Sequence, residues 1–385
     1  MNTSKSKPSL SRMATIEDVR RVAQRRLPAF VLPYLECGTG EERCLIRNRD
    51  ALAAVKLTPT FLHGNLKPDL ATRLFDVDYK APFGIAPVGM TSLLWPDAEY
   101  LLAKTAAGLR IPYSFSTVAG EAMERIGGCV DDMGWFQLYV ARQQPITNDL
   151  IKRAADTGFT ALAVTVDVPV PSRREAMRRV GLRTPPKLSP TMAWQCLWHP
   201  AWSLATIKRG MPRFRTLESY PEYTTNGDIS EFFQSQLSGS VNWQVFESIR
   251  RQWKGPLMIK GVLHPRDAIR AVEFGADGIW VSNHGGRQLD AAPSPIDVLA
   301  VIRTAIGDDV PIIADSGVRS GLDVARMLAL GADFVMLGRA FMYGVCAFGA
   351  DGVEHVAGMI ADDLTNVMTQ VGIRRPADLA KALVE

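Results

Sequence analysis

The sequence has few cysteines and no long apolar run, and both absences limit what the protein can be. No run approaches the roughly 18 apolar residues that span a bilayer, so we expect no transmembrane helix. The N-terminal MNTSKSKPSLSRM has no apolar signal-peptide core, which predicts a cytoplasmic protein. No CxxC pair occurs, which argues against a disulfide framework or a bound metal. The five scattered cysteines are Cys37, Cys44, Cys129, Cys196 and Cys346.

Net charge is also low. The 385 residues carry a formal charge of +4, too small an excess to predict nucleic-acid binding. With 47% apolar residues, the chain has enough material for a core, so disorder and a collagen-like structure are excluded. The length fits two average domains or one large α/β barrel with additions.

The small net charge hides one concentrated basic segment. Residues 171–215 contain ten basic residues and one acid, Glu175, so this segment carries +9 and the rest of the chain −5. Trp194, Trp198 and Trp202 follow at helical spacing and predict one apolar stripe flanked by cations. We expect peripheral membrane contact through residues 175–215, on the inner face of the cell membrane. The alternative is that the stripe packs on the protein or on another subunit.

Eight short apolar runs alternate with helical patterns. Several of these runs lack period-two alternation, as is typical of parallel strands buried on both faces. Because no GxGxxG motif follows an early strand, a (β/α)8 TIM barrel is favoured over an open doubly wound sheet. The runs are 82–89, 111–117, 135–140, 160–167, 256–261, 277–283, 311–317 and 334–340.

The barrel pattern divides the chain into three parts. We expect one domain over 1–385, with a helical N-terminal segment (1–80) whose first helix begins near Thr15. The barrel follows over 81–350 and contains the basic, Trp-bearing insert at about 175–240, between strands four and five. The last part, 351–385, is predicted to be a pair of helices, the first ending near Gly372.

Polar and charged residues follow the carboxyl ends of the predicted strands, where such barrels place their active sites. Asp315 to Arg319 follow strand seven and Gly338-Arg339 follow strand eight, and glycines beside arginines in this position predict a phosphate site. The string Ser282-Asn-His-Gly-Gly-Arg-Gln-Leu-Asp290 follows strand six. It places His284 near Arg287, a base beside a cation that suits proton abstraction from an anionic substrate. We expect Asp315 to orient the His284 imidazole.

The string SNHGGRQLD resembles the signature of the FMN-dependent (S)-2-hydroxy acid dehydrogenase and oxidase family, which includes glycolate oxidase, flavin-type lactate dehydrogenase and mandelate dehydrogenase. The resemblance extends over almost the whole chain through LPAFVLPYLECGTGEE, IRNRDAL, APFGIAPVGM, WFQLYV, TVDVPVPSRRE, IKGVLHPRDA, IADSGVRSGLDV and LGRAFMYG. It implies an enzyme that uses FMN, and a homotetramer.

The resemblance assigns roles residue by residue. It implies that His284 is the base and Asp315 its partner, that Arg174 and Arg287 grip the substrate carboxylate, and that Tyr34 and Tyr139 are the active-site tyrosines. Lys260 would face the N1–O2 edge of the flavin. The other residues implied to bind the flavin ring are Pro87, Val88, Gly89, Ser116, Gln137 and Thr165. Those implied to bind the ribityl and phosphate groups are Ser282, Asp315, Gly317, Arg319, Gly338 and Arg339.

The substrate and the electron acceptor are left open by the resemblance. Gly89 and Val118 stand where glycolate oxidases carry larger side chains, which favours a bulkier 2-hydroxy acid such as mandelate. The insert, with its WHPAW pattern, looks more like that of bacterial lactate dehydrogenases. The basic insert favours a membrane quinone or similar carrier as acceptor. The alternative is an oxidase that reduces O2 to H2O2.

Two other classes compete with this interpretation. A type 2 isopentenyl diphosphate isomerase also has a flavin barrel, but Arg174 and Arg287 argue against it because that enzyme binds no substrate carboxylate. A catalytically silent barrel that binds membranes through the insert is the second. It would purify colourless, whereas the enzyme would be yellow.

Overall fold

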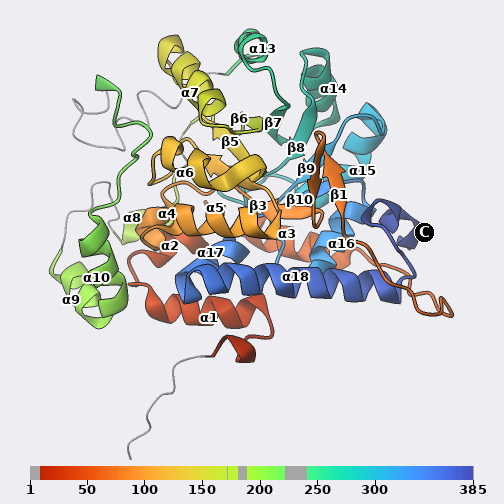
Figure 1. Cartoon of the computed structure of the whole chain (residues 1–385), viewed down its shortest axis with the longest axis horizontal. Helices are drawn as coiled ribbons and strands as arrows, with labels where there is room; N and C mark the ends of the chain where they lie inside the picture. Colours follow the sequence, from red (N-terminus) through yellow and green to blue (C-terminus); the bar gives the residue numbers. More distant parts are fainter. Residues whose placement is uncertain (1–8, 171, 181–188, 222–240, 385) are drawn as a thin grey trace, which may run out of the picture.

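The computed structural model describes residues 9–170, 172–180, 189–221 and 241–384. Its centre is a closed barrel of eight parallel strands in the order β10-β3-β4-β5-β6-β7-β8-β9 (Figure 1). The predicted (β/α)8 barrel is confirmed, and each of the eight predicted apolar runs overlaps one strand, with β5 beginning one residue before its run and β7 ending one residue after its run. The strands are β3 (Phe83–Ile85), β4 (Tyr113–Ser116), β5 (Gly134–Leu138), β6 (Ala161–Thr165), β7 (Leu257–Val262), β8 (Gly278–Val281), β9 (Ile312–Ala314) and β10 (Phe334–Leu337).

Helices surround the barrel, as the 3.6-residue periodicity predicts. The helices between the strands are α4 (Thr91–Leu94), α5 (Ala98–Leu109), α6 (Met123–Val130), α7 (Gln144–Asp156), α13 (Trp243–Gln252), α14 (Pro265–Glu273), α15 (Pro295–Ile306) and α16 (Gly321–Ala329). A short 3-10 helix, η2 (Asp131–Met133), precedes β5. No helix in the described ranges is long and apolar enough to cross a membrane.

The N-terminal segment is helical only as far as residue 54. It begins with η1 (Leu10–Arg12) and continues with α1 (Ile16–Arg26), α2 (Leu32–Glu36) and α3 (Arg43–Ala54). Thr15 caps α1 as expected, since its hydroxyl accepts the Asp18 N–H while the Asp18 carboxylate accepts the Thr15 N–H. The prediction of helix up to residue 80 is wrong beyond α3, because β1 (Thr72–Leu74) and β2 (Val77–Tyr79) form an antiparallel hairpin.

Aromatic side chains fill one end of the barrel. The Trp135 ring lies 6.1 Å from Trp280 and 5.9 Å from Phe334, measured between ring centroids. Tyr79, on β2, is 5.3 Å from Phe334, and its hydroxyl accepts the Trp135 indole N–H at 3.1 Å. All four side chains are buried. Because Trp135 lies near the start of β5 and Phe334 begins β10, this packing closes the end of the barrel opposite the carboxyl ends of the strands.

The C-terminal part packs against the N-terminal part. After α17 (Arg339–Phe348), the long helix α18 (Ala350–Gln370) runs alongside α17, and α1 packs on α17 as well (Figure 1). Gly372 follows the end of α18 with a left-handed φ of 72°, as predicted for a helix stop. The second predicted helix is the 3-10 helix η4 (Pro376–Ala382).

The basic insert does not form one tryptophan-bearing helix, and this prediction is wrong. Its described part contains α8 (Glu175–Arg179), α9 (Pro190–Trp198) and α10 (Pro200–Arg209). The helix is interrupted at His199-Pro200 because proline disrupts a helix interior. Trp194 and Trp198 are 60% and 67% exposed and contact each other. Trp202, by contrast, is buried, and its indole N–H lies 3.0 Å from the Leu94 carbonyl oxygen.

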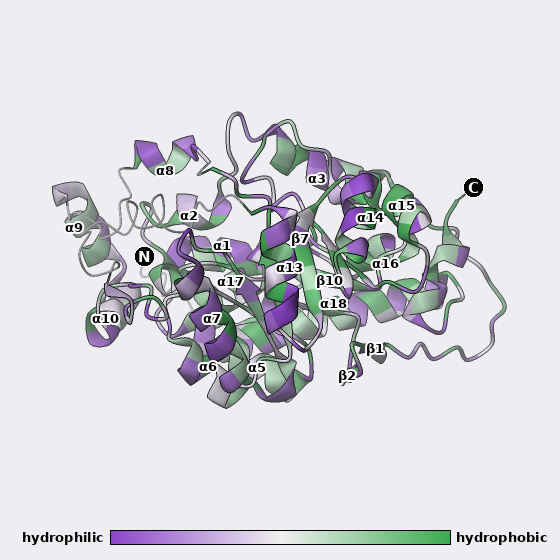
Figure 2. Cartoon of the chain, turned by 90° about the horizontal axis from the view of Figure 1, so that it is seen from above, coloured by the Kyte–Doolittle hydropathy of each residue, from purple (hydrophilic) through white to green (hydrophobic). Residues whose placement is uncertain are grey.

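The insert occupies one end of the molecule. In Figures 1 and 2, α9 and α10 lie at the end opposite the C-terminus. Ion pairs hold α10 in place: Arg209 pairs with Asp97 and Glu121, and Arg215 lies 3.9 Å from Glu121. These two arginines are therefore not free to contact a membrane. Arg183 and Lys187, which contribute to the +9 charge, lie outside the described residues.

Trp202 is expected to anchor the α9–α10 hairpin. Because Trp202→Ala removes the buried ring that also contacts Phe30 at 5.8 Å, it should lower the free energy of local unfolding by about 3 kcal/mol. Tryptic cleavage after Lys208 and Arg209 should then be on the order of 10²-fold faster. The exposed Trp198→Ala is the matched control and should leave the cleavage rate unchanged. Equal rates in the two variants would contradict the anchoring role.

Candidate active site

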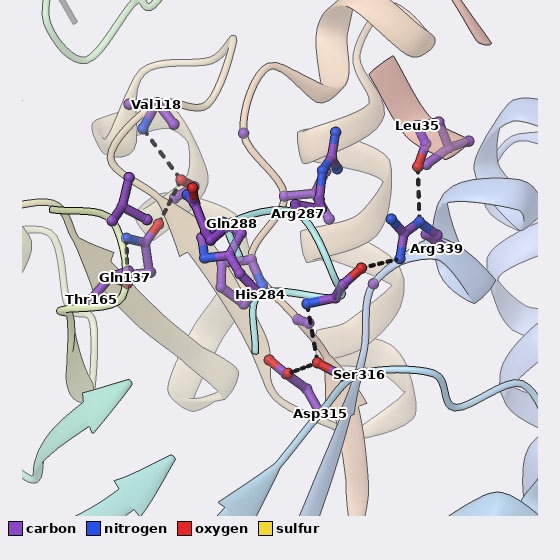
Figure 3. Close-up of a pocket in the computed structure, with 18 of the residues that line it drawn as sticks. Leu35, Val118, Gln137, Thr165, His284, Arg287, Gln288, Asp315, Ser316 and Arg339 are labelled. Carbon is purple, nitrogen blue, oxygen red and sulfur yellow. Dashed lines mark hydrogen bonds between the residues drawn. The ribbon is translucent and has the colours of Figure 1, made fainter. Parts of the chain in front are cut away.

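One cavity of about 410 Å³ opens at the carboxyl ends of the barrel strands. This volume falls within the range of cofactor and substrate sites. Every residue predicted for the site lines this cavity except Ser282, which is buried directly behind it. Figure 3 shows that Val118, Gln137 and the loop that carries His284 and Arg287 approach the cavity from separate segments. The barrel thus brings together residues that are up to 305 positions apart, Tyr34 and Arg339 being the extremes.

The loop after β8 holds His284 in a left-handed conformation. His284, Gly285 and Gly286 have φ values of 58°, 65° and 76°, which is uncommon for a residue with a side chain. Side chains accept the N–H of all three residues: Ser282 Oγ, Ser316 Oγ and Asn283 Oδ1, each at 3.1 Å. Strain of this kind is maintained where surrounding bonds determine the conformation.

The side chain that pairs with His284 is Asp167, and the predicted pairing with Asp315 is wrong. His284 Nδ1 lies 3.0 Å from Asp167 Oδ1, and His284 Nε2 lies 3.3 Å from the Tyr139 hydroxyl. With a proton on Nδ1 donated to Asp167, Nε2 is left as the basic atom on the Tyr139 side. Burial lowers the pKa of His284 below its ordinary value of 6.5, although Asp167 opposes this effect.

Sequence reasoning placed Asp167 at a strand end but gave it no role. Asp167 follows β6 and His284 follows β8, so the pair must reach across β7. The structure shows how: Gly261 in β7 has a φ of 109°, and a Cβ there would lie 2.5 Å from the Asp167 Cβ. The pairing register also shifts between Lys260 and Val262. The glycine after the Lys260 strand end was the one sequence signal for this close approach.

Asp315 neutralises Lys260. The Lys260 ammonium lies 3.0 Å from Asp315 Oδ2 and donates to Ser282 Oγ at 2.8 Å. The same carboxylate accepts hydrogen bonds from Ser282 and from the Trp280 indole N–H. A buried ammonium requires such a partner. The sequence predicts that the Asp315 carboxylate pairs with His284, whereas in the structure it pairs with Lys260.

A polar chain joins three neighbouring strand ends on the other wall. Ser116 Oγ donates to Gln137 Oε1 at 2.7 Å, and Gln137 Nε2 donates to Thr165 Oγ1 at 2.8 Å. All three side chains are buried and line the cavity. Hydroxyl and amide groups fixed in this way can recognise a polar, planar ring.

Three partly buried arginines at the cavity have no carboxylate partner in the described part of the chain. Within the described ranges, no ion pair is formed by Arg287, Arg319 or Arg339. Loss of hydration lowers the pKa of Arg287 to about 9, and repulsion from Arg174 and Arg339 adds to this effect. Loss of hydration also lowers the pKa of Arg319 to about 10 and shifts that of Arg339 downward. Anions would stabilise such mutually repelling cations, so the cavity is suited to anionic ligands.

The arginines fall into two groups. Arg319 and Arg339 follow β9 and β10, where barrels commonly bind phosphate. Arg339 is fixed by the carbonyl oxygens of Leu35 and Gly285 (Figure 3). Arg287, two residues after Gly285, donates to the Tyr34 carbonyl oxygen. Its buried Nε has no hydrogen-bond partner in the part of the chain that the structure describes.

Comparison with known proteins identifies the ligand chemistry. A model of the FMN-dependent dehydrogenase family matches residues 23–385. The chain belongs to this family. It is 40% identical to an L-lactate dehydrogenase of Stenotrophomonas maltophilia over 366 residues, covering 94% of this chain and 96% of that protein. The protein is therefore an FMN-dependent 2-hydroxy acid oxidoreductase.

Solved structures support the same assignment. A crystal structure of a monotopic membrane protein, (S)-mandelate dehydrogenase, superposes with a TM-score of 0.92 at 33% identity, covering 97% of this chain and 99% of that chain. A mandelate oxidase variant in complex with (S)-mandelic acid has a TM-score of 0.81 at 30% identity, covering 96% and 98%. Relatives with this fold thus include both dehydrogenases and oxidases.

The cavity fits FMN on its own chemistry. The cofactor has a phosphate, for which Arg319 and Arg339 supply unneutralised charge, and a polar ring system, for which Gln137 and its two neighbours supply hydrogen bonds. Lys260 would supply a cation near the negative charge of a reduced flavin. Bound FMN would supply the two-electron acceptor. The chain itself would supply the base and the carboxylate-binding cations.

The role of Asp167 predicts a specific pH dependence. With His284 as the base, its neutral form would be active, so the rate of flavin reduction should rise with pH, with a midpoint below 6.5. Asp167→Asn should lower that midpoint further, because the carboxylate that favours the imidazolium is lost. It should slow reduction by a factor on the order of 10² or more, measured by stopped-flow absorbance. In the comparison variant Asp315→Asn the unneutralised Lys260 also disfavours the imidazolium, but the midpoint should fall less than in Asp167→Asn because Asp315 does not contact His284. A larger fall in Asp315→Asn than in Asp167→Asn would restore the pairing expected from the sequence.

Proposed function

We propose that this protein oxidises an (S)-2-hydroxy acid, lactate or a bulkier one such as mandelate, to the 2-oxo acid. The proposal depends on one observation. Arg174 and Arg287 lie near each other at the cavity that His284 also lines, and neither has a carboxylate partner in the described part of the chain. A substrate with a carboxylate next to its hydroxyl-bearing carbon would place the carboxylate on the arginines and the hydroxyl near a base.

Each residue then has a distinct task. Arg174 and Arg287 bind the carboxylate, and His284 Nε2 takes the hydroxyl proton while Asp167 stabilises the resulting imidazolium. Tyr34 and Tyr139 stay protonated because burial raises the pKa of both phenols, so each can donate a hydrogen bond. The residues we propose to hold FMN are Pro87, Val88, Gly89, Ser116, Gln137, Thr165, Lys260, Ser282, Asp315, Gly317, Arg319, Gly338 and Arg339. The homotetramer stays a prediction from the family resemblance.

The cavity wall favours an apolar substrate side chain. Val118, Met177 and Phe214 line it together with Gly89. Gly89 does not simply add space, since a Cβ there would lie 2.7 Å from Val118 Cγ2. The valine therefore packs directly on the glycine, and the remaining room adjoins apolar side chains. This supports substrates larger than glycolate.

Anaerobic flavin bleaching across a substrate panel tests this proposal. We expect the yellow protein to be bleached by (S)-lactate, (S)-2-hydroxyoctanoate or (S)-mandelate with a higher kcat/KM than by glycolate, by about 10-fold or more because an apolar group gains contact in the pocket. The (R) enantiomers are the control and should not bleach the flavin. A preference for glycolate would contradict the proposed pocket, and a colourless protein would contradict the function.

We further propose that the acceptor is a membrane quinone or a similar carrier. Exposed apolar side chains on and after the α9–α10 hairpin support membrane contact, with Lys208 and Arg213 as adjacent cations. The (S)-mandelate dehydrogenase with the similar fold is described as a monotopic membrane protein. The exposed residues are Trp194 (60%), Leu197 (73%), Trp198 (67%), Leu204 (67%), Ile207 (78%) and Met211 (44%).

Vesicle sedimentation tests the membrane contact. The triple variant Trp194→Ser/Leu197→Ser/Trp198→Ser should lose binding to vesicles that contain anionic lipid, and should reduce a bilayer-embedded quinone more slowly. Its flavin reduction by substrate should be unaffected. The matched control Ile269→Ser/Val301→Ser changes exposed apolar residues on α14 and α15 and should still bind. Undiminished binding of the triple variant would contradict membrane contact through the α9–α10 hairpin. Rapid reoxidation by O2 with no reaction with quinone would favour the oxidase.

A further inference from the structure

A buried carboxyl group lies behind the wall of the cavity. Glu99, in the first turn of α5, is 1% exposed and does not line the cavity itself. Its Oε1 accepts the Gly120 N–H at 2.7 Å and the Ser92 N–H at 3.2 Å. A carboxyl group is costly to bury, so one that binds two backbone N–H groups is expected to have a structural or functional reason.

The two N–H groups belong to the two segments that form the substrate side of the wall. Ser92 lies in the segment that carries Gly89, and Gly120 lies in the segment that carries Val118. A direct hydrogen bond also joins them, since the Met90 N–H donates to the Val118 carbonyl oxygen at 2.7 Å. Glu99 is thus a second tie between the same segments, placed on the side away from the cavity.

The segment with Gly89 and Ser92 packs tightly against the segment with Val118 and Gly120. A Cβ on Gly120 would overlap Ser92 Oγ and lie 3.1 Å from Glu99 Oε1. On the cavity side, Val118 already packs on Gly89, and the Tyr34 hydroxyl donates to the Gly89 carbonyl oxygen at 2.7 Å. In close-packed structure of this kind, a shift of either segment moves the other. A change at Glu99 would therefore reach Val118 and Gly89.

The environment of Glu99 favours its protonated form more than water does. Burial raises its pKa more than its hydrogen bonds lower it. A neutral carboxyl group and a carboxamide have nearly the same shape, and both keep an oxygen that accepts the two N–H groups. Glutamine is therefore the conservative replacement, and methionine keeps the length of the side chain while removing the acceptor.

We propose that Glu99 is a positioning residue that sets the preference of the enzyme for the substrate side chain, by holding the Gly89 and Val118 segments together from behind. It touches neither substrate nor cofactor. This inference rests on the proposed function, since it assumes that the wall formed by these segments contacts the side chain of a 2-hydroxy acid.

The test is the ratio of kcat/KM for (S)-mandelate to that for (S)-lactate in the FMN-loaded enzyme. Glu99→Met should lower this ratio by about 10-fold or more, because a bulky side chain depends most on the wall. The rate of flavin reduction at saturating lactate should change by less than about 3-fold, because the base and the arginines are untouched. Glu99→Gln should restore the wild-type ratio.

Matched variants separate positioning from a general loss of stability. Asp333→Ala removes a carboxylate that accepts the Ile312 N–H at 2.7 Å beside the amino end of β9, far from the wall. It should lower the melting temperature without changing the ratio. Ser92→Pro removes one of the two N–H donors in the first turn of α4, where proline is tolerated. It should lower the ratio by a smaller factor, and it replaces Glu99→Met as the test if that variant does not fold.

The outcomes are distinguishable. An unchanged ratio in Glu99→Met, or in Ser92→Pro when that variant stands in, overturns the proposal. So does a Glu99→Gln enzyme as impaired as Glu99→Met, or an equal shift in Asp333→Ala. The proposed function fails separately, when the wild-type flavin is reduced by no 2-hydroxy acid in the panel.

Discussion

The unneutralised positive charge at the mouth of the barrel is the constraint on which the rest of the site depends. Arg287, Arg319 and Arg339 are partly buried with no ion pair in the described chain, and loss of hydration lowers their pKa values. Lys260, by contrast, has a carboxylate partner, Asp315. Such a cluster is unfavourable until anions enter it. With the proposed ligands bound, the cofactor phosphate and the substrate carboxylate would be part of the charge balance of the fold, which would tie folding stability to ligand binding.

The protonation of His284, the proposed base, depends on two opposing effects. Burial favours neutral His284, which is the form that accepts a proton, whereas Asp167 favours the protonated form that results. Neither effect alone suits a base that must gain and then lose a proton. The geometry relies on Gly261, which lets Asp167 reach past β7 to the loop after β8. The Asp167–His284 contact, and with it the pKa of His284, therefore depends on the backbone of β7, a strand that contributes no side chain to this contact.

The sequence predicts the features that depend on local pattern, and it misses those that depend on which segments meet. The eight strands were identified because parallel strands buried on both faces are apolar throughout. His284 and Arg287 lie in one string and were found together. The Asp167–His284 pair joins residues 117 positions apart on strands that are not neighbours, and no local pattern encodes it. The burial of Trp202 depends on a helix break, for which Pro200 was the available signal.

The insert has two opposite surfaces, and this accounts for the charge pattern. Arg209 and Arg215 are held at Glu121, so part of the +9 charge attaches the insert to the barrel. Beyond this attachment, Met211 is 44% exposed, whereas Phe214, three residues later, is buried and lines the cavity. The same short stretch thus connects the exposed apolar surface to the wall of the active site.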